Sequence, residues 1–375
     1  MAFAHELSGG SSAFLMKKPM KPMKTRRNLI QLCLFCALLL SALASAQNLF
    51  VLGSTNTFGF PPTGFILEFS PTGSENTFVS GLTLSSGLGF DTAGNLFEAD
   101  NFSGNIYEFT NQAGVLSSNR VAFATGLYEP QGLAFDSVGN LFEVDLGSHI
   151  VNTGIMHKFT PSGVGSVFAS GLNPTALAID RSNNVYVTDI ESMSIYEFTP
   201  NGAESTFVSG LHYPIGLAFD SEGDLFEADA DSGNIYEFLN SGGVLSSNYI
   251  IFASGLSSPL GLVFDSTGNL FETDYDIHGN INKFTTGGIR STFASGLSYP
   301  RALAFQPIPE LQAFATNGTV QITVSMPSPY YSTIIQASTN LGNWFNIYTN
   351  TPPFTFTNSM TTIFPNCFYR ALLGH

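Results

Sequence analysis

The chain has 375 residues, of which 28 are acidic and 13 basic, so its formal net charge is −15. A charge of this sign opposes contact with phosphate backbones, and we therefore exclude a nucleic-acid partner. Of the three cysteines, only Cys367 lies beyond residue 46, so residues 47–375 contain no internal disulfide.

Residues 1–46 are predicted to be a secretory signal peptide with an extended basic segment, within which Met23 is an alternative start. Six basic residues precede the apolar run Leu29–Leu43, and Ala44–Ala46 is a small-residue cleavage site. We expect a secreted, periplasmic or cell-surface protein with no membrane span after cleavage. A retained membrane anchor is the alternative, because the apolar run approaches spanning length. Without this segment the net charge is near −20, which leaves cations, neutral or basic ligands and polysaccharides open.

A repeated phrase, Gly-Leu-Ala-Phe-Asp-Ser-x-Gly-Asn-Leu-Phe-Glu-x-Asp, dominates residues 47–305. Full copies begin 40 to 45 residues apart, at Gly87, Gly132, Ala176, Gly216 and Gly261. Short apolar runs separated by Gly, Asn and Pro turns at this period are typical of a β-propeller, with one four-stranded sheet per repeat. In the second copy the strands are expected at 132–136, 141–145, 155–159 and 166–170. We interpret the 35 Phe residues as packing between blades.

The two ends of residues 47–305 are predicted to share one blade. Asn48–Val51, Gly64–Phe69 and Glu75–Ser80 match the second, third and fourth strands of the repeat, whereas Arg301–Phe305 matches the first strand alone. Their combination closes an all-β ring of six blades and removes two exposed sheet edges.

A second symmetry lies within the first. The blades that begin at Gly87 and Gly216 are 129 residues apart, and the stretch Gly114–Asn119 recurs at Gly243–Asn248 with that offset. The Gly132 and Gly261 blades are related in the same way. We infer that a half of three blades was duplicated.

Residues 306–375 are predicted to be a separate small β-sandwich. Alternating stretches at 319–324, 332–337, 344–348, 354–357 and 367–371 suggest about five strands. Gln336–Trp344 together with Phe368–Ala371 resembles a short C-terminal β-module common on exported bacterial proteins. If this module serves attachment or sorting, the whole chain is a structural surface protein.

The blade phrase resembles the NHL repeat and the related propellers of SMP-30-like gluconolactonases and streptogramin lyases over residues 48–305. That resemblance implies a ligand face made by the loops between the second and third strands and by the loops joining one blade to the next. The ligand-face residues it implies here are Tyr128, Glu129, His149, His212, Tyr213, His278 and Tyr299.

Catalysis is the less favoured function. A lactonase of this kind implies a divalent metal held by a Glu, Asn residues and an Asp from different blades, but the chain has Val51, Gly53 and Ser54 where that Glu is expected. His212 and Glu129 are the candidate catalytic side chains. We favour a non-catalytic, monomeric binding or scaffold protein for a protein, polysaccharide or small-molecule ligand. The alternative is a metal-dependent lactonase or lyase.

An aspartate ends the second strand of every full blade. If these carboxylates ring one mouth, they form a cation site that suits Ca²⁺; the members are Asp100, Asp145, Asp189, Asp229 and Asp274. The alternative is that each Asp accepts backbone amides in its own loop, as Asp does in turns. We favour this alternative, because an Asp repeated in every full blade indicates a structural requirement shared by all blades, whereas a specific site uses residues that differ among them.

Glutamates precede four of these aspartates by two residues, which places both carboxylates on one face of the strand. They are Glu98, Glu143, Glu227 and Glu272, and Val51 and Val187 hold the position in the other two blades. A buried carboxylate requires a hydrogen-bond donor, a shared proton or a metal. Hydrogen bonds to neighbouring groups are favoured over calcium between blades.

Overall fold

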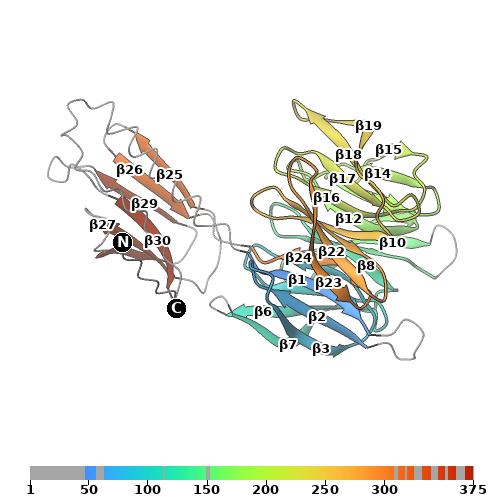
Figure 1. Ribbon diagram of the computed structural model, residues 1–375, viewed down its shortest axis with the longest axis horizontal. Coiled ribbons are helices and arrows are strands. Elements are labelled where there is room, and N and C mark those ends of the chain that lie inside the picture. The colour runs from blue at the N-terminus through green and yellow to red at the C-terminus, as the bar shows by residue number, and fades with distance from the viewer. Residues whose placement is uncertain are drawn as a thin grey trace, which may run out of the picture. The chain divides into compact units, whose positions relative to one another are not determined.

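The computed structural model describes residues 47–55, 63–112, 115–148 and 153–307, together with six strands beyond residue 310. Every regular element in these parts is a β-strand (Figure 1). Within them, no helix has the length and apolar character needed to cross a membrane. The predicted signal peptide and His149 lie outside the described residues.

Six four-stranded antiparallel sheets form the propeller, and we number them as blades 1 to 6. Blade 1 consists of β24 (Leu303–Phe305), β1 (Leu49–Ser54), β2 (Gly64–Phe69) and β3 (Glu75–Leu82). Blade 2 consists of β4 (Ser85–Phe90), β5 (Leu96–Asp100), β6 (Asn105–Gln112) and β7 (Val115–Thr125), and blade 3 of β8 (Pro130–Phe135), β9 (Leu141–Asp145), β10 (Gly154–Phe159) and β11 (Gly165–Leu172).

The remaining three blades follow the same order along the chain. Blade 4 consists of β12 (Pro174–Ile179), β13 (Val185–Asp189), β14 (Ser194–Phe198) and β15 (Glu204–Ser209). Blade 5 consists of β16 (Pro214–Phe219), β17 (Leu225–Asp229), β18 (Asn234–Ser241) and β19 (Val244–Ala253), and blade 6 of β20 (Pro259–Phe264), β21 (Leu270–Asp274), β22 (Gly279–Phe284) and β23 (Arg290–Leu297).

The ring closes as the sequence predicts. Strand β24 pairs antiparallel with β1, with Leu49 opposite Phe305, Phe50 opposite Ala304 and Val51 opposite Leu303. Blade 1 is therefore assembled from both ends of the propeller sequence (Figure 1). The prediction of an all-β, six-bladed propeller closed in this way is confirmed.

The glycine that begins the repeated phrase allows the first strands of neighbouring blades to approach closely. A Cβ atom on Gly216 would lie 1.9 Å from the carbonyl oxygen of Leu260, and one on Gly87 would lie 2.1 Å from that of Gln131. No side chain fits such a gap, which explains glycine here without any need for a positive φ angle.

Aromatic clusters hold the blades to one another. Phe50 on a second strand makes edge-to-face contacts with Phe78 on the fourth strand and with Phe90 on the first strand of the next blade, each with ring centroids 5.3 Å apart. The same trio recurs as Phe97, Phe123 and Phe135; Tyr186, Phe207 and Phe219; Phe226, Phe252 and Phe264; and Phe271, Phe293 and Phe305. Such pairs add to the free energy gained from burial, and the interpretation of Phe as packing between blades is confirmed.

The tail is a separate unit, because residues 45–308 group together and the strands after residue 309 belong to another compact unit. Its six strands form two antiparallel sheets. One contains β25 (Leu311–Thr316), β26 (Thr319–Val324) and β29 (Phe354–Ser359), and the other contains β28 (Phe345–Asn350), β27 (Ser332–Ser338) and β30 (Phe368–Gly374). The β-sandwich formed from these sheets stays a prediction.

Candidate functional site

Among the described residues, backbone hydrogen bonds join the loops at one end of the blades, and we call these loops the collar. In blade 2, the amide of Phe102 between β5 and β6 donates to the carbonyl of Leu84 in the preceding connection at 3.2 Å. The amide of Leu127 in the following connection donates to Gly104 at 2.9 Å. Equivalent bonds in other blades join Leu146 to Glu129, Ile190 to Asn173, Leu211 to Met193, Ala230 to Tyr213, Leu256 to Gly233, Tyr275 to Ser258 and Tyr299 to Asp276. We call this end the loop face.

The aspartate at the end of each second strand holds this collar together. Asp229 accepts the amide of His212 at 2.7 Å with one carboxylate oxygen and the amide of Ser232 at 2.9 Å with the other. The other aspartates accept hydrogen bonds in the same way. The amides of Tyr128 and Gly147 donate to Asp145, those of Asn173 and Ser192 to Asp189, and that of Ser257 to Asp274. Asp100 accepts the amide of Ser103 and the hydroxyl of Thr83. The bonds from Ser232, Gly147, Ser192 and Ser103 lie in the aspartate's own loop, as the turn interpretation predicts. The bonds from the preceding connections between blades were not predicted. Among the described residues, only Asp145 of the five joins a group of metal-ligating side chains.

The ligand-face residues expected from the resemblance lie in this collar, apart from His149, which is not described. Tyr128 and Tyr213 are 49% and 39% exposed, and the side chains of His212 and His278 are also exposed. Among the described residues, neither imidazole is hydrogen-bonded, although His278 donates its backbone amide to Asp276 at 3.0 Å. The loop face therefore presents these two imidazoles to solvent.

Two loop-face residues have left-handed backbone conformations. Glu129 has a φ of 58° and Tyr299 a φ of 46°, and each immediately precedes a proline. A residue before proline favours extended backbone, so these conformations cost free energy that the surrounding structure must supply. Both residues occupy the same place in connections between blades, and strain of this kind concentrates at functional sites.

The structure adds apolar loop-face residues that the sequence analysis missed. Phe102, Met193 and Ile277, all between second and third strands, are 56%, 48% and 54% exposed. Their loops were predicted to reach the ligand face, but the exposure of an individual side chain depends on the conformation of its loop. In the sequence, the signal for these residues was an apolar side chain within a loop expected on the ligand face.

Arg301 is a second addition, at the connection that leads into blade 1. Its Nη2 donates to the hydroxyl of Tyr275 at 2.8 Å, and its guanidinium carbon lies 4.8 Å from the centre of that ring. Tyr299 stacks at a tilt on Tyr275 with centroids 5.2 Å apart. The collar thus holds the Arg301 cation against the ring of Tyr275, which in turn contacts Tyr299, in a chain that is otherwise strongly acidic.

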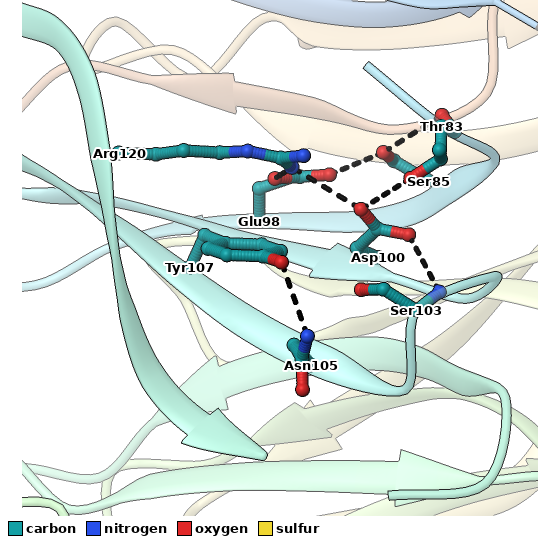
Figure 2. Close-up of polar contacts among 8 residues, drawn as sticks. All are labelled: Thr83, Ser85, Glu98, Asp100, Ser103, Asn105, Tyr107 and Arg120. Carbon is teal, nitrogen blue, oxygen red and sulfur yellow. Dashed lines mark hydrogen bonds and ion pairs between the residues drawn. The ribbon is translucent and has the colours of Figure 1, made fainter. Parts of the chain in front are cut away.

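The glutamates of the second strands are buried between blades, and each has a different environment. Glu98 has no exposed surface and accepts hydrogen bonds from Ser85 and from Nη1 of Arg120, the latter at 2.6 Å. Figure 2 shows Arg120 lying over the ring of Tyr107, with its guanidinium carbon 3.8 Å from the ring centre. Burial raises the pKa of Glu98, while the Ser85 hydroxyl and the guanidinium oppose that rise.

Glu227 lacks such a partner, although it is the twin of Glu98 in the duplicated half. Neither of its side-chain oxygens has a side-chain partner, and it has no exposed surface. Burial, with the neighbouring charge of Asp229, raises the pKa of Glu227 well above its usual range. Burial therefore favours the neutral, protonated form of this carboxyl group.

Glu272 and Glu143 each have one side-chain hydrogen-bond partner, fewer than Glu98 and more than Glu227. Glu272 accepts the side-chain amide of Asn282 at 2.8 Å, and burial raises its pKa well above the usual range. Glu143 lies 3.0 Å from Nδ1 of His157, and burial raises its pKa to about 7. The favoured expectation of hydrogen bonds to neighbouring groups is confirmed for Glu98, Glu143 and Glu272.

Comparison with known proteins supports the fold. No family model and no curated protein matches the chain. A chain in a nidogen–laminin complex is similar over 69% of this chain and 98% of its own, with 17% identity and a TM-score of 0.55. A gluconolactonase from Xanthomonas campestris is similar over 73% of this chain and 92% of its own, with 16% identity and a TM-score of 0.51. A streptogramin B lyase is similar over 73% of this chain and 94% of its own, with 13% identity and a TM-score of 0.49. The expected resemblance to this propeller superfamily is confirmed as a likeness of fold.

Proposed function

We propose that the chain is an exported, non-catalytic binding protein whose loop face holds an uncharged polymeric ligand. One observation supports the binding role most directly: three exposed aromatic rings, Phe102, Tyr128 and Tyr213, stand on loops of that face. Exposed apolar side chains gathered on one face are a property of interaction sites. They are carried by a hydrogen-bonded collar, so little order has to be gained on binding.

The chemistry of the loop face favours a polysaccharide as the ligand. The flat apolar faces of sugar rings stack on aromatic side chains, while sugar hydroxyls exchange hydrogen bonds with carboxylates, amides and tyrosine hydroxyls. The strongly negative charge of the chain disfavours acidic polymers. A neutral polysaccharide meets both conditions.

The environment of the described loop-face histidines favours binding over turnover. Among the described residues, the imidazoles of His212 and His278 have no carboxylate to orient them. The aspartates that end the second strands already accept backbone amides. A propeller fold by itself is compatible with either role.

The test is a binding assay with purified protein from residue 47 onward and insoluble chitin, cellulose and xylan as probes. We expect at least one of these to retain the protein, and the Tyr128→Ala/Tyr213→Ala double variant to lose most of that binding. The matched control is Val138→Ser/Val164→Ser, which changes two exposed valines on the turns at the opposite end of blade 3. Equal retention of the tyrosine and valine variants would place binding elsewhere and contradict the proposal.

The alternative function is a metal-dependent lactonase or lyase. The fold likeness to a gluconolactonase motivates this alternative, and Glu129 and His212 are its candidate catalytic residues. Its test is turnover of gluconolactone by the purified protein with Ca²⁺, Mg²⁺ or Zn²⁺ added. Turnover that disappears in His212→Ala or Glu129→Gln would show that the protein is an enzyme and would contradict the non-catalytic proposal.

We further propose that the protein acts outside the cytoplasm, because a basic segment, an apolar run and a small-residue cleavage site begin the chain. Fractionation of cells that express the full chain, with mass spectrometry of the mature N-terminus, tests this location. A deletion of residues 309–375 tests whether the tail attaches the protein. If the deleted protein is found in the same cell fraction as the full chain, the tail does not serve attachment.

A further inference from the structure

The Glu–Asp pairs of the second strands share a position that a positively polarised nitrogen occupies in two blades. In blade 2, Nη1 of Arg120 lies 2.6 Å from Oε2 of Glu98 and 3.2 Å from Oδ2 of Asp100. In blade 6, Nδ2 of Asn282 lies 2.8 Å from Oε2 of Glu272 and 3.1 Å from Oδ2 of Asp274. The two carboxylates therefore face a common point that suits a cation.

Blade 3 has the carboxylate pair but lacks the arginine. Gly165 stands at the fourth-strand position that Arg120 holds in blade 2, as the pairing of Gly165 with Phe159 and of Arg120 with Phe109 shows. Gly165 has no side chain to reach inward, and a Cβ atom there would lie 2.6 Å from the ring of Phe159. What faces Glu143 instead is His157, directly opposite it on the third strand.

We propose that Glu143, Asp145 and His157 bind one zinc-type divalent cation between blades 2 and 3. One ligand atom from each residue lies within 4.8 Å of the other two. Glu143 has no exposed surface, and its Oε1 has no hydrogen-bond partner, which is costly for a buried carboxylate oxygen. A bound cation satisfies this oxygen.

The ligand set selects the kind of ion. Two carboxylates and one imidazole match zinc, whose bonds to nitrogen and oxygen are about 2.0–2.2 Å long. Tetrahedral coordination places ligand atoms about 3.3 Å apart, so small side-chain movements close the site. Calcium requires six to eight oxygen ligands, and magnesium requires near-octahedral oxygen coordination, so both fit this set poorly.

The surroundings indicate a structural ion. Only the His157 side chain, 17% exposed, connects the group to solvent, where water can supply the fourth ligand. The two oxygens of Asp145 accept the amides of Tyr128 and Gly147 at 2.8 and 2.9 Å. Each carboxylate oxygen has two lone pairs, so these bonds orient the ligand without preventing coordination. The ion thereby connects the blade interface to the loop that carries Tyr128.

The experiment uses tag-free protein from residue 47 onward, stripped with a chelator and titrated with ZnCl₂ by calorimetry. We expect one zinc per chain and a rise in the melting temperature, and Co²⁺ in place of zinc should give the intense visible absorption of a four-coordinate site. His157→Ala and the near-isosteric Glu143→Gln should each lose the equivalent of zinc and the cobalt spectrum. The matched control His212→Ala removes an exposed histidine elsewhere and should keep both.

Circular dichroism of each variant establishes that it is folded before it is titrated, and either of the two ligand variants suffices if the other fails to fold. Failure of the folded wild-type chain to bind zinc would overturn the proposal, as would unchanged binding by a folded His157→Ala or Glu143→Gln protein. Calcium is titrated in parallel. Binding of calcium that is lost in these variants, without binding of zinc, would overturn the assignment of the ion.

Discussion

Arg120 and Tyr249 occupy the same position on the fourth strands of blades 2 and 5, each opposite a third-strand phenylalanine and 129 residues apart. Arg120 forms an ion pair with the buried Glu98. Tyr249 instead packs its ring on Tyr236 with centroids 4.6 Å apart, and Glu227 beneath it has no cation. Twin carboxylates in one chain thus differ in their environment: a guanidinium neutralises Glu98, whereas burial without a cation raises the pKa of Glu227.

Arg120→Met is expected to destabilise the protein, because it leaves Glu98 and Asp100 buried together without a cation. Removal of one partner of a buried pair costs about 3–5 kcal/mol, and the partial exposure of Arg120 favours the lower end. Urea unfolding followed by fluorescence measures the change. Arg181→Met, at an exposed arginine that bonds the carbonyl of Ser221, should change stability by less than about 0.5 kcal/mol. Equal effects of the two variants would contradict the role assigned to Arg120.

Glu98→Val added to Arg120→Met should recover most of the lost stability. Val51 and Val187 already occupy the position of Glu98 in two blades, so an apolar side chain fits there. Replacement of a buried ion pair by apolar residues is often neutral or stabilising. A double variant as unstable as the single Arg120→Met protein would show that the pair is needed for more than charge compensation.

Glu227→Val is expected to stabilise the protein by about 1–2 kcal/mol at neutral pH, because it removes a buried carboxyl group without side-chain partners. The gain should depend on pH. The folded-state pKa of Glu227 lies well above its unfolded value of about 4.3, so the folded chain binds the extra proton between the two values. The unfolding free energy of the parent chain therefore falls as pH rises through that window.

Urea unfolding at about pH 5 and about pH 8 measures this dependence, and the advantage of Glu227→Val should be larger at the higher pH. Glu222→Gln, at an exposed glutamate in a turn of the same blade, is the control and should show no such trend. A constant advantage at both pH values would mean that Glu227 does not hold a proton in the folded state.

Gly216→Ala is expected to destabilise the propeller by about 1–3 kcal/mol, the usual cost of overpacking. Its Cβ would lie 1.9 Å from the carbonyl oxygen of Leu260, so the first strands of blades 5 and 6 would have to separate. Gly287→Ala is the matched control, since its nearest neighbour would be 3.9 Å away and its φ is not positive. Thermal unfolding compares them. Similar melting temperatures for the two variants would contradict the close approach of these strands.

Phe50→Ala and Phe102→Ala should separate the two uses of phenylalanine. Phe50 is 1% exposed and contacts Phe78 and Phe90, so its removal should cost about 3–5 kcal/mol. Phe102 is 56% exposed on the loop face, so its removal should leave the melting temperature almost unchanged and weaken retention on polysaccharide. Loss of stability without loss of binding in Phe102→Ala would show that this ring serves the fold.

The architecture could be predicted because its determinants are local and repeated. The period of the phrase sets one sheet per copy, and the incomplete copies around Phe50 and Ala304 required a shared blade. The hydrogen bond from the Ser232 amide to Asp229 could be expected as well, because turn chemistry depends on few neighbouring residues.

The partners of the buried glutamates could not be predicted, because they depend on the register of three strands. Arg120 reaches Glu98 from the outermost strand, and a β-bulge between Ile106 and Tyr107 shifts the pairing on the way. The opposition of His157 to Glu143 likewise follows from the register of β9 and β10. Repetition within the sequence identified the carboxylates, but only the paired strands identify what neutralises them.

The pairing of β24 with β1 sets the order in which the molecule can be completed. Residue 305 is synthesised more than 250 residues after Leu49, so β1 exists for most of translation with one edge unpaired. During that interval the edge accepts β24 from any copy, its own or a neighbour's. A neighbouring chain that already carries β24 can supply it, so high local concentrations of chains favour exchanged dimers, whereas dilution favours rings made from a single molecule.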